Sequence, residues 1–578
     1  MSIASLYPSI NPSLLLDFAN TKQLDPRITF TRTTTATYYD GVTTAKAEEN
    51  LVTYSQEFDN AAWLKNSLTV SANAAAAPDG TTTAEEITFT GSGDYLLQIV
   101  KVTAGLQYTF SFYAKAGTAT GAQYRVYNVT AGSDIVAATS YYSSINSSTW
   151  TRISVTFTVP SGCSEIYVYL SRSSATSGTM FLWGAQLEQR SSVTAYTATT
   201  TQAITNYIPV LQTAAAGQAR FDHNPTTGES LGLLIEEQRT NSLTYSEQFN
   251  NAAWSLYGTT VTTNAIVSPN GLQNGEKIVE TTANDIHRIS QGSISVTSGT
   301  AYTFTVYAKA GERTFIENRI YDGSTNAGVA TFDLVNGTVS GVTGSASMTL
   351  VGNGWYRCVL TATATSSSAL GLIYLKISSG VDTWTGNGYS GAFLWGAQLE
   401  AGSFATSYIP TVASTVTRNA DAASMTGTNF SSWFNNGEGT IYAENSFIGV
   451  GSSAYPGVYK FSDGTISNRF GMYGRPSGAG YGAIMTTLGS LAASLEPISG
   501  STATAINTYS RLSYGYKVND FGATRNASTV TTDTSGNVAV GVNQLNIGLY
   551  DEYMSGTIKK LAYYPIRVTN AQLQALTV

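Results

Sequence analysis

The sequence predicts an all-β protein, with three antiparallel β-sandwich or jelly-roll domains in tandem, and three observations lead to this prediction. Only 12% of the 578 residues are charged, whereas Gly (54), Tyr (36), Ser and Thr are abundant, a composition typical of strands joined by many turns. Apolar and polar residues alternate with a period of two in many segments. One long stretch is present twice. We therefore expect little helix.

The repeated stretch opens with Tyr-Ser-x-x-Phe-x-Asn-Ala-Ala-Trp, at 54–63 and again at 245–254. Three further marks follow in the same order in both copies: Tyr-Ala-Lys-Ala-Gly, Trp-x-Arg, and Phe-Leu-Trp-Gly-Ala-Gln-Leu-Glu, the last ending at Glu188 and Glu400. The extra residues of the second copy fall between marks, where loops tolerate insertion. We expect the two copies to share strand order, with the extra residues in loops.

These marks divide the chain into an N-terminal segment (1–49), module 1 (50–196), a connector (197–240), module 2 (241–410) and a C-terminal domain (411–578). Prolines interrupt the N-terminal segment, which has too little apolar surface for a core and should order on a partner surface. Pro and Gly in the connector predict irregular structure. An alternating pattern in the C-terminal domain predicts a third sandwich, and Thr569 or Asn570 can cap one short terminal helix.

Charge and hydropathy exclude two classes of partner. The net charge is −7 and no block of Lys and Arg occurs, so a nucleic-acid backbone has no electrostatic reason to bind. No apolar run is long enough for membrane insertion, and the N-terminus does not have the pattern of an ordinary signal peptide. Cys163 and Cys358 do not match between the copies, which predicts separate buried thiols.

The sequence offers little for catalysis, and we expect no catalytic residues. His223 and His287 are the histidines of the chain, and neither a His-Glu-x-x-His nor a Gly-x-Ser-x-Gly motif occurs. Acidic pairs at 48–49, 85–86 and 236–237 could supply the two carboxylates of a glycan depolymerase. Neighbouring residues of a strand point to opposite faces, however, so this remains a minor alternative.

Carbohydrate binding requires exposed aromatic rings beside polar groups, and tyrosine suits this because its ring is apolar and its tip polar. Tryptophans at 63, 254, 183 and 395 occupy the same places in both copies and are predicted to be core residues. Aromatic residues that break the repeat are the better ligand candidates. These are Tyr141, Tyr142, Trp384, Tyr389, Tyr473, Tyr481, Tyr550 and Tyr553.

The opening and closing marks resemble those of carbohydrate-binding-module-like jelly rolls in fibre and spike proteins of tailed bacteriophages. Residues 411–578, with 556–576 as the signature, resemble the concanavalin A-like (laminin-G-like) domain found at the C-terminus of such proteins. The resemblance covers nearly the whole chain. It implies a homotrimer on the virion surface, assembled in the host cytoplasm, whose residues 1–49 attach to other virion proteins and whose domains bind host-surface polysaccharide.

The resemblance carries three further expectations. Carboxylates in related jelly rolls often hold a structural calcium, which makes Glu188 and Glu400 candidate ligands, whereas the alternative is an ordinary hydrogen-bonded carboxylate. No other cofactor is expected. A chain fixed at its N-terminus places its far end outermost, so host contact is expected mainly on 411–578, unless that domain is a trimerisation cap. The competing function is a head or tail decoration fibre that acts as a spacer without a ligand.

Overall fold

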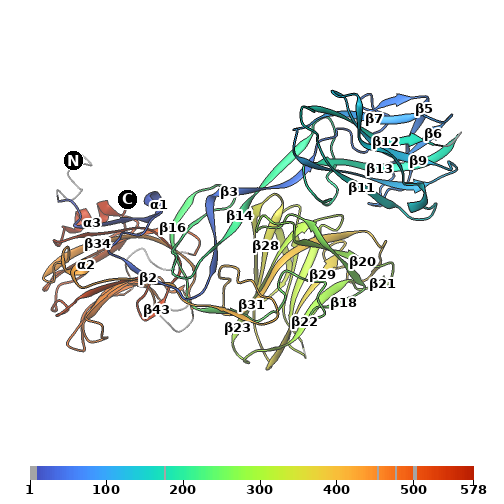
Figure 1. The fold of residues 1–578 in the computed structure, drawn as a ribbon. Coiled ribbons are helices and arrows are strands. Elements are labelled where there is room, and N and C mark those ends of the chain that lie inside the picture. Colours follow the sequence, from blue (N-terminus) through green and yellow to red (C-terminus); the bar gives the residue numbers. More distant parts are fainter. Residues whose placement is uncertain are drawn as a thin grey trace.

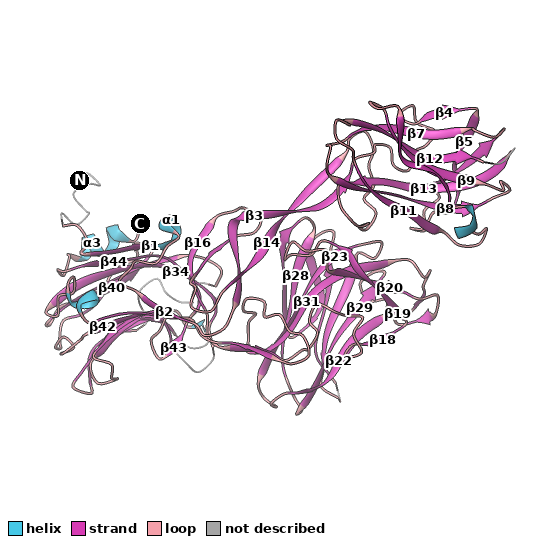
Figure 2. Cartoon of the chain, in the orientation of Figure 1, coloured by secondary structure: helices cyan, strands magenta, loops and turns pink. Residues whose placement is uncertain are grey.

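The computed structural model describes residues 10–174, 177–323, 325–451, 455–475, 478–496, 498, 504 and 506–578. Strands dominate the described chain, as Figure 2 shows, and the α-helices are short: α1 (Phe18–Thr21), α2 (Thr428–Ser431) and α3 (Asn570–Leu576). The all-β prediction is confirmed. Helix α3 begins as expected, because the Thr569 hydroxyl accepts a hydrogen bond from the Gln572 N–H while the Gln572 side chain accepts one from the Thr569 N–H.

Module 1 is a sandwich of two five-stranded antiparallel sheets. The first sheet has the order β10 (Ser133–Ser140), β9 (Ala122–Asn128), β12 (Glu165–Ser173), β7 (Tyr95–Lys101) and β4 (Leu64–Asn66). The second has the order β11 (Thr151–Thr158), β8 (Gln107–Ala116), β13 (Gly178–Glu188), β6 (Ala84–Phe89) and β5 (Leu68–Ala75). A 3₁₀ turn, η2 (Tyr142–Ser144), follows β10.

Module 2 repeats this strand order and adds one edge strand to each sheet. Its first sheet has the order β18 (Ser255–Tyr257), β22 (Arg288–Ser295), β29 (Ser368–Lys376), β24 (Phe315–Tyr321), β25 (Asn326–Asp333) and β26 (Thr338–Thr343). Its second has the order β19 (Thr259–Ile266), β20 (Gly275–Glu280), β31 (Gly391–Ala401), β23 (Ala301–Ala310), β28 (Trp355–Thr363) and β27 (Ser345–Gly352). A small ladder joins β21 (Asn284–Asp285) to β30 (Trp384–Thr385).

The shared strand order was predicted, but the placement of the extra residues in loops was wrong in part. Strands β26 and β27 lie between the second and third marks, and each extends one sheet of module 2. An edge strand offers unpaired N–H and C=O groups, so an inserted segment can add a strand there without disturbing the core.

The C-terminal domain is a third sandwich, of two eight-stranded sheets. One sheet has the order β15 (Arg220–His223), β16 (Ser230–Ile235), β44 (Ser555–Tyr564), β34 (Glu438–Gly449), β39 (Ser510–Lys517), β40 (Phe521–Arg525) and β41 (Thr531–Asp533), with β1 (Leu14–Asp17) also on β44. The other has the order β2 (Thr29–Thr31), β33 (Ala422–Thr426), β42 (Gln544–Ile547), β35 (Pro456–Ser462), β36 (Arg469–Gly474), β37 (Tyr481–Thr487) and β38 (Ser490–Leu495), with β43 (Glu552–Tyr553) parallel to β35.

This sandwich takes strands from two parts of the chain that the sequence placed outside it. Strands β1 and β2 come from the N-terminal segment, and β15 and β16 from the connector. Leu14, Leu16 and Phe18 are buried in the core of the C-terminal domain. The partner surface expected for the N-terminal segment is therefore this domain of the same chain, and its attachment role stays a prediction.

The connector is also more regular than predicted. Its strand β14 (Ile204–Ala214) pairs with the long strand β3 (Ala36–Asn50), and together they form a two-stranded ribbon that leads to module 1 (Figure 1). A second short ladder joins β17 (Arg239–Asn241) to β32 (Val416–Arg418). These strands find their partners far away in the sequence, so the local Pro and Gly pattern could not reveal them.

The tryptophans at the repeated positions lie in two kinds of cluster: Trp63 and Trp254 in the cores of the modules, and Trp183 and Trp395 in smaller clusters beside them. Trp63, Trp183, Trp254 and Trp395 are all buried, as predicted, and so are the free thiols of the two cysteines. One asparagine closes each module: the Asn50 amide donates to the backbone oxygens of Ala185 and Thr197, and Asn241 makes the matching pair of bonds in module 2.

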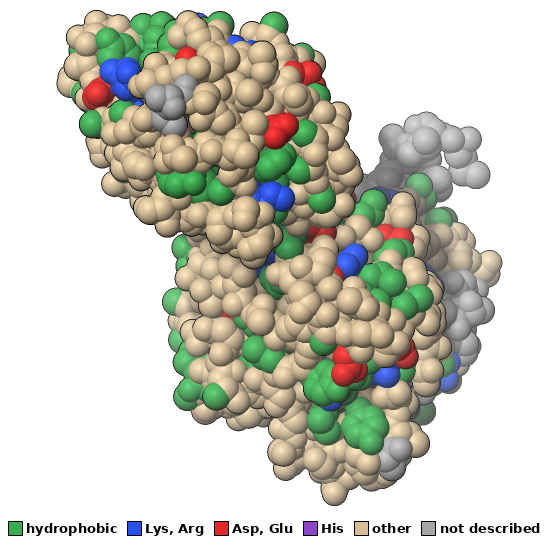
Figure 3. All heavy atoms as spheres, turned by 90° about the vertical axis from the view of Figure 1, so that its right-hand side faces the viewer, with side chains coloured by type: hydrophobic (Ala, Val, Ile, Leu, Met, Phe, Trp, Pro, Cys, Tyr) green, Lys and Arg blue, Asp and Glu red, His purple; other side chains and the backbone are tan. Residues whose placement is uncertain are grey.

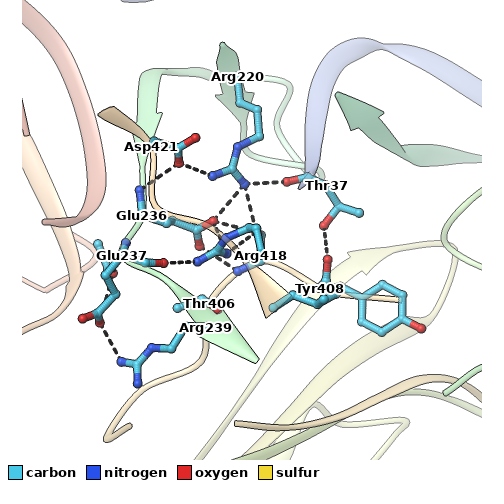
Figure 4. Close-up of polar contacts among 12 residues, drawn as sticks. Thr37, Arg220, Glu236, Glu237, Arg239, Thr406, Tyr408, Arg418 and Asp421 are labelled. Carbon is cyan, nitrogen blue, oxygen red and sulfur yellow. Dashed lines mark hydrogen bonds and ion pairs between the residues drawn. The ribbon is translucent and has the colours of Figure 1, made fainter. Parts of the chain in front are cut away.

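A buried ion-pair cluster, which we call the hub, joins the connector to the start of the C-terminal domain (Figure 4). It consists of Arg32, Arg220, Glu236, Arg418 and Asp421, all fully buried. Arg220 lies 2.8 Å from the Glu236 carboxylate and 2.5 Å from that of Asp421, while Arg418 lies 2.6 Å from Glu236 and Arg32 lies 2.8 Å from Asp421. The hub ties the first described strands, the connector and residues 416–421 together.

Module 1 lies at the end of the molecule opposite the C-terminal domain (Figure 1). The Ser13 N–H donates to the Tyr563 carbonyl oxygen, so the chain starts and finishes its described path on the same sandwich. This removes the premise that 411–578 lies farthest from an N-terminal attachment point. Attachment near residue 10 would leave module 1 outermost.

Candidate glycan-binding site

Alternation along two neighbouring strands of module 1 builds an aromatic surface. On β9 and β12, Val126 and Val168 point into the core, so the residues on either side of them face solvent. The outward positions hold Arg125 and Tyr127 on β9, and Tyr167 on β12. The register places Tyr167 directly opposite Tyr127.

Four tyrosines form this surface, which we call the tyrosine face: Tyr95, Tyr127, Tyr167 and Tyr169, together with Arg125. The Tyr127 and Tyr167 rings are stacked, with centroids 6.0 Å apart, and Tyr169 lies 6.5 Å from Tyr167. Tyr95 meets Tyr169 edge-on at 5.5 Å. The rings of Tyr95, Tyr127 and Tyr167 are half-buried, whereas Tyr169 is largely covered.

A guanidinium group holds the rings of the tyrosine face in place. The Arg125 guanidinium lies 4.5 Å from the Tyr127 ring centroid and 5.3 Å from that of Tyr169. Its Nε donates to the Asp134 carboxylate at 2.6 Å. Burial raises the pKa of Tyr169 while Arg125 opposes the shift, so this hydroxyl stays protonated at neutral pH and can donate.

This arrangement suits a sugar ring better than an ion or an apolar molecule. A pyranose has an apolar C–H face that can lie on a tyrosine ring, and hydroxyl groups at its edge that can bond phenol and guanidinium groups. Because rigid tyrosines lose little conformational freedom on binding, they are efficient contact residues. The sheet also fixes the spacing between the rings.

The corresponding sheet of module 2 carries charges instead of a row of rings. Arg319 lies 2.5 Å from Glu317 and 3.5 Å from Asp382, and Lys376 pairs with the same two carboxylates. The buried Tyr374 ring lies beneath the Arg319 guanidinium at 4.1 Å. These groups satisfy one another, so the tyrosine face is particular to module 1.

Comparison with known proteins does not identify a family for this chain. No family model matches the sequence, and no curated protein matches it. Among solved structures, the Ruminococcus gnavus IT-sialidase CBM40 bound to α2,3-sialyllactose is 13% identical over 26% of this chain and 88% of its own, with a TM-score of 0.22. The CBM22 tandem domain of Paenibacillus barcinonensis Xyn10C is 14% identical over 62% and 99%, with a TM-score of 0.21.

The mouse laminin alpha1 chain, domains LG4-5, is 10% identical over 50% of this chain and 89% of its own, with a TM-score of 0.17. Similarity at this level supports no inference about this chain. The site therefore rests on the geometry of its own residues.

The structure contradicts four of the predicted ligand residues, because their rings are buried. Tyr141 stacks on Tyr124 inside module 1. Tyr473 and Tyr550 pack on each other in the C-terminal domain, with centroids 4.6 Å apart, and Tyr481 is buried there too. Breaking the repeat did not imply exposure, since each module or domain can fill its core with its own aromatics.

The other four predicted residues lie apart from one another. Tyr142 is half-buried in η2. Trp384 is 9% exposed and donates its indole N–H to the Glu280 carboxylate at 3.0 Å, which indicates a packing role. Tyr553 is half-buried between module 2 and the C-terminal domain. Tyr389 is half-buried and lines a cleft between the two modules.

The two carboxylates considered for calcium are fully buried and already have donors. Glu188 accepts from the Thr194 N–H at 2.9 Å and its hydroxyl at 2.7 Å, and Glu400 accepts the same pair of bonds from Thr406 at 2.8 and 2.6 Å. A glutamine amide donates to each as well. This matches the alternative of a hydrogen-bonded carboxylate.

Among the described residues, no group of three or more His, Cys, Asp and Glu side chains converges to hold a metal ion. No helix in the described part of the chain has the length and hydropathy to cross a membrane.

Sequence reasoning missed the tyrosine face although a signal was present. The alternation at 166–170 is typical of a strand, and it puts Tyr167 and Tyr169 on the side opposite the aliphatic residues. Two tyrosines two residues apart on the solvent side of a strand lie on one face. Only the pairing of β12 with β9 adds Arg125 and Tyr127, and this pairing is not visible in the sequence.

Proposed function

We propose that this chain is a structural protein of a tailed-bacteriophage virion, a fibre or spike that binds host-surface polysaccharide through the tyrosine face of module 1. The observation that carries the binding proposal is the set of four tyrosines on the solvent side of one sheet, braced by Arg125. The virion setting rests on the resemblance of the repeated marks. No catalysis and no bound calcium form part of the proposal.

The proposed attachment of the N-terminal segment implies an orientation on the particle. If the N-terminal segment attaches the protein to other virion proteins, module 1 points away from the particle, since β1 and β2 belong to the C-terminal sandwich. A homotrimer would then present three tyrosine faces, and multivalency would strengthen weak sugar contacts. The protein would fold and assemble in the host cytoplasm and act on the virion surface.

A glycan array probed with the full-length protein tests the binding proposal. We expect a signal with bacterial surface polysaccharides, and release of no reducing ends from the bound glycan. Absence of any signal above background would favour the alternative of a decoration fibre that acts as a spacer, a role that the rigid buried hub also suits. Mass photometry at micromolar concentration tests the homotrimer, which a stable monomer would contradict.

A further inference from the structure

A cleft of about 610 Å³ separates modules 1 and 2 and does not belong to the tyrosine face. Module 1 contributes Tyr113, Arg152 and Tyr196 to its lining, and module 2 contributes Lys277 and Tyr389. Figure 3 shows acidic, basic and apolar side chains gathered where the upper lobe, module 1, meets the rest of the molecule. A volume of this size is typical of small-molecule binding sites.

The residues of module 1 that line the cleft can be compared with their counterparts in module 2. In module 1 the Arg152 guanidinium lies 5.3 Å from the Tyr113 ring, which meets Trp183 at 5.4 Å, and Trp183 meets Tyr196 at 4.6 Å. Module 2 repeats this stack with spacings of 5.7, 5.2 and 4.8 Å. Both modules therefore present the same aromatic stack.

What covers the stack differs between the copies. In module 2 the β3–β14 ribbon packs its apolar side chains, among them Tyr39 and Ile208, onto the stack. Tyr307 and Tyr408 are each only 2% exposed as a result. In module 1 the cluster around Trp183 contains residues of module 1 alone, and the rings that match Tyr307 and Tyr408 are half-buried and line the cleft.

Module 2 closes only one side of the open stack. The Tyr389 ring meets Tyr113 edge-on at 6.4 Å, and the Lys277 ammonium lies 4.3 Å from the Tyr389 ring centroid. Exposed hydroxyls of β19, at Thr260 and Thr262, continue this wall. The cleft thus has aromatic rings on its module 1 wall and on its module 2 wall, and the module 2 wall also carries exposed hydroxyl groups.

The charges in the cleft leave little for an ionic ligand. Lys277 lies 2.7 Å from Glu312, and Lys309 forms an ion pair with Glu48. The Arg152 guanidinium donates to the Thr194 carbonyl oxygen at 2.6 Å and the Ser111 hydroxyl at 3.1 Å. An anion would have to break one of these pairs, and the further carboxylate of the lining, Asp79, already accepts hydrogen bonds from the Thr81 N–H and hydroxyl. A neutral polyhydroxylated molecule can bond to these groups as they stand.

We propose that this cleft is a second ligand site, which binds a neutral oligosaccharide between the two modules. In module 2 the β3–β14 ribbon covers the aromatic stack, and in module 1 the bound sugar takes the place of that ribbon. One sugar ring lies against Tyr113 and Tyr196, and its hydroxyl groups reach Lys277 and the threonines of β19. This site does not depend on the tyrosine face, so either can fail without the other.

The test uses full-length protein and maltotetraose, cellotetraose, mannotetraose and chitotetraose, with a hexuronate tetramer as the charged comparison. Saturation-transfer NMR detects binding, and titration gives Kd. Thr262→Trp fills the cleft from an exposed position, and Tyr389→Ala removes one wall. Tyr167→Ala, on the tyrosine face, is the matched control.

We expect at least one neutral tetrasaccharide to bind, with Thr262→Trp and Tyr389→Ala each raising Kd about tenfold or more and Tyr167→Ala leaving it within about twofold. Unchanged thermal unfolding of Thr262→Trp shows that the fold is intact. Three results would overturn the proposal: no neutral tetrasaccharide binds at millimolar concentration, only the hexuronate binds, or Thr262→Trp binds as well as the unmodified protein.

Discussion

At the scale of single residues, each module has one buried glutamate at the same place, and the two places differ in the charge of a neighbouring residue. In module 1 the Glu85 carboxylate accepts hydrogen bonds from the N–H groups of Phe58, at 2.6 Å, and Asp59, at 3.1 Å. Glu276 holds the opening turn of module 2 in the same way. Both glutamates are buried. Each therefore couples its ionisation to the turn that contains the repeated Tyr-Ser mark.

Burial raises the pKa values of both glutamates, by different amounts. Burial raises the pKa of Glu85 to about 8, with the negative charge of Asp59 adding to the effect. Burial raises the pKa of Glu276 to about 7, and the neighbouring residue there is the neutral Asn250. In the unfolded chain a glutamate loses its proton near its ordinary pKa of 4.5, whereas in the folded protein Glu85 keeps its proton up to about pH 8. The free energy of unfolding therefore falls as pH rises from about 4.5 to about 8.

Asp59→Asn should isolate this effect. Removing the negative charge lowers the pKa of Glu85 toward that of Glu276, so the variant should unfold at a higher temperature than the unmodified protein at pH 8. At pH 5 both proteins hold Glu85 protonated, so the charge repulsion is absent and the stabilisation seen at pH 8 should be lost. Calorimetry at the two pH values provides the check, and Asn250→Asp should show the opposite difference. An equal shift at pH 5 and pH 8 would rule out Glu85 as the cause.

At the scale of elements, β1 shows that the N-terminal segment is part of a sandwich. Leu14 and Leu16 are 1% and 2% exposed, whereas Leu15 between them is 53% exposed. Leu16→Ala should lower the free energy of unfolding by about 2–4 kcal/mol, since it removes a buried side chain and leaves a cavity. Leu15→Ala, the control on the same strand, should change it by less than about 0.5 kcal/mol. Urea unfolding of both variants measures this; equal effects would mean that β1 does not pack as described.

The sequence predicted the elements that depend on local pattern and missed those that depend on distant partners. The repeated modules, the third sandwich and the Thr569 cap could all be predicted, because alternation and capping are local signals. The strands β1, β2 and β16 could not, since each is short and pairs with a strand far along the chain, and β15 joins the sheet only through β16. The same limit applies to the tyrosine face, where Tyr167 was visible as a strand residue but its neighbour Tyr127 was not.

At the scale of the whole molecule, the hub links module 2 to the C-terminal domain, because the Glu236 carboxylate also accepts hydrogen bonds from the Ser407 N–H at 2.7 Å and the Ser407 hydroxyl at 2.6 Å. Burial alone would raise the pKa of Glu236, but Arg418 and Arg220 hold it at about 2. Glu236 therefore stays ionised through the physiological range, and its contribution to stability is lost only as pH falls from about 4.5 toward 2.

Glu236→Gln should lower the free energy of unfolding by about 3 kcal/mol, because it leaves two arginines in the interior with too few anionic partners. Glu229→Gln is the control, since Glu229 forms an exposed ion pair with Lys559 and its loss should cost less than about 1 kcal/mol. Chemical unfolding gives both values, and small-angle scattering should show a larger radius of gyration for Glu236→Gln alone. Matching losses in the two variants would contradict a structural role for the hub.

The central claim is that module 1 carries the glycan contact, and titration calorimetry of a double variant tests it most directly. The measurement compares the unmodified full-length protein, Tyr127→Ala/Tyr167→Ala and the control Tyr207→Ala, with the polysaccharide fragment that gives the strongest array signal. Tyr207 is 59% exposed on the ribbon and lies outside the tyrosine face. We predict that the double variant binds at least about tenfold more weakly, a loss of about 1.4 kcal/mol, while Tyr207→Ala binds as the unmodified protein does. A folded double variant with unchanged affinity would contradict the claim.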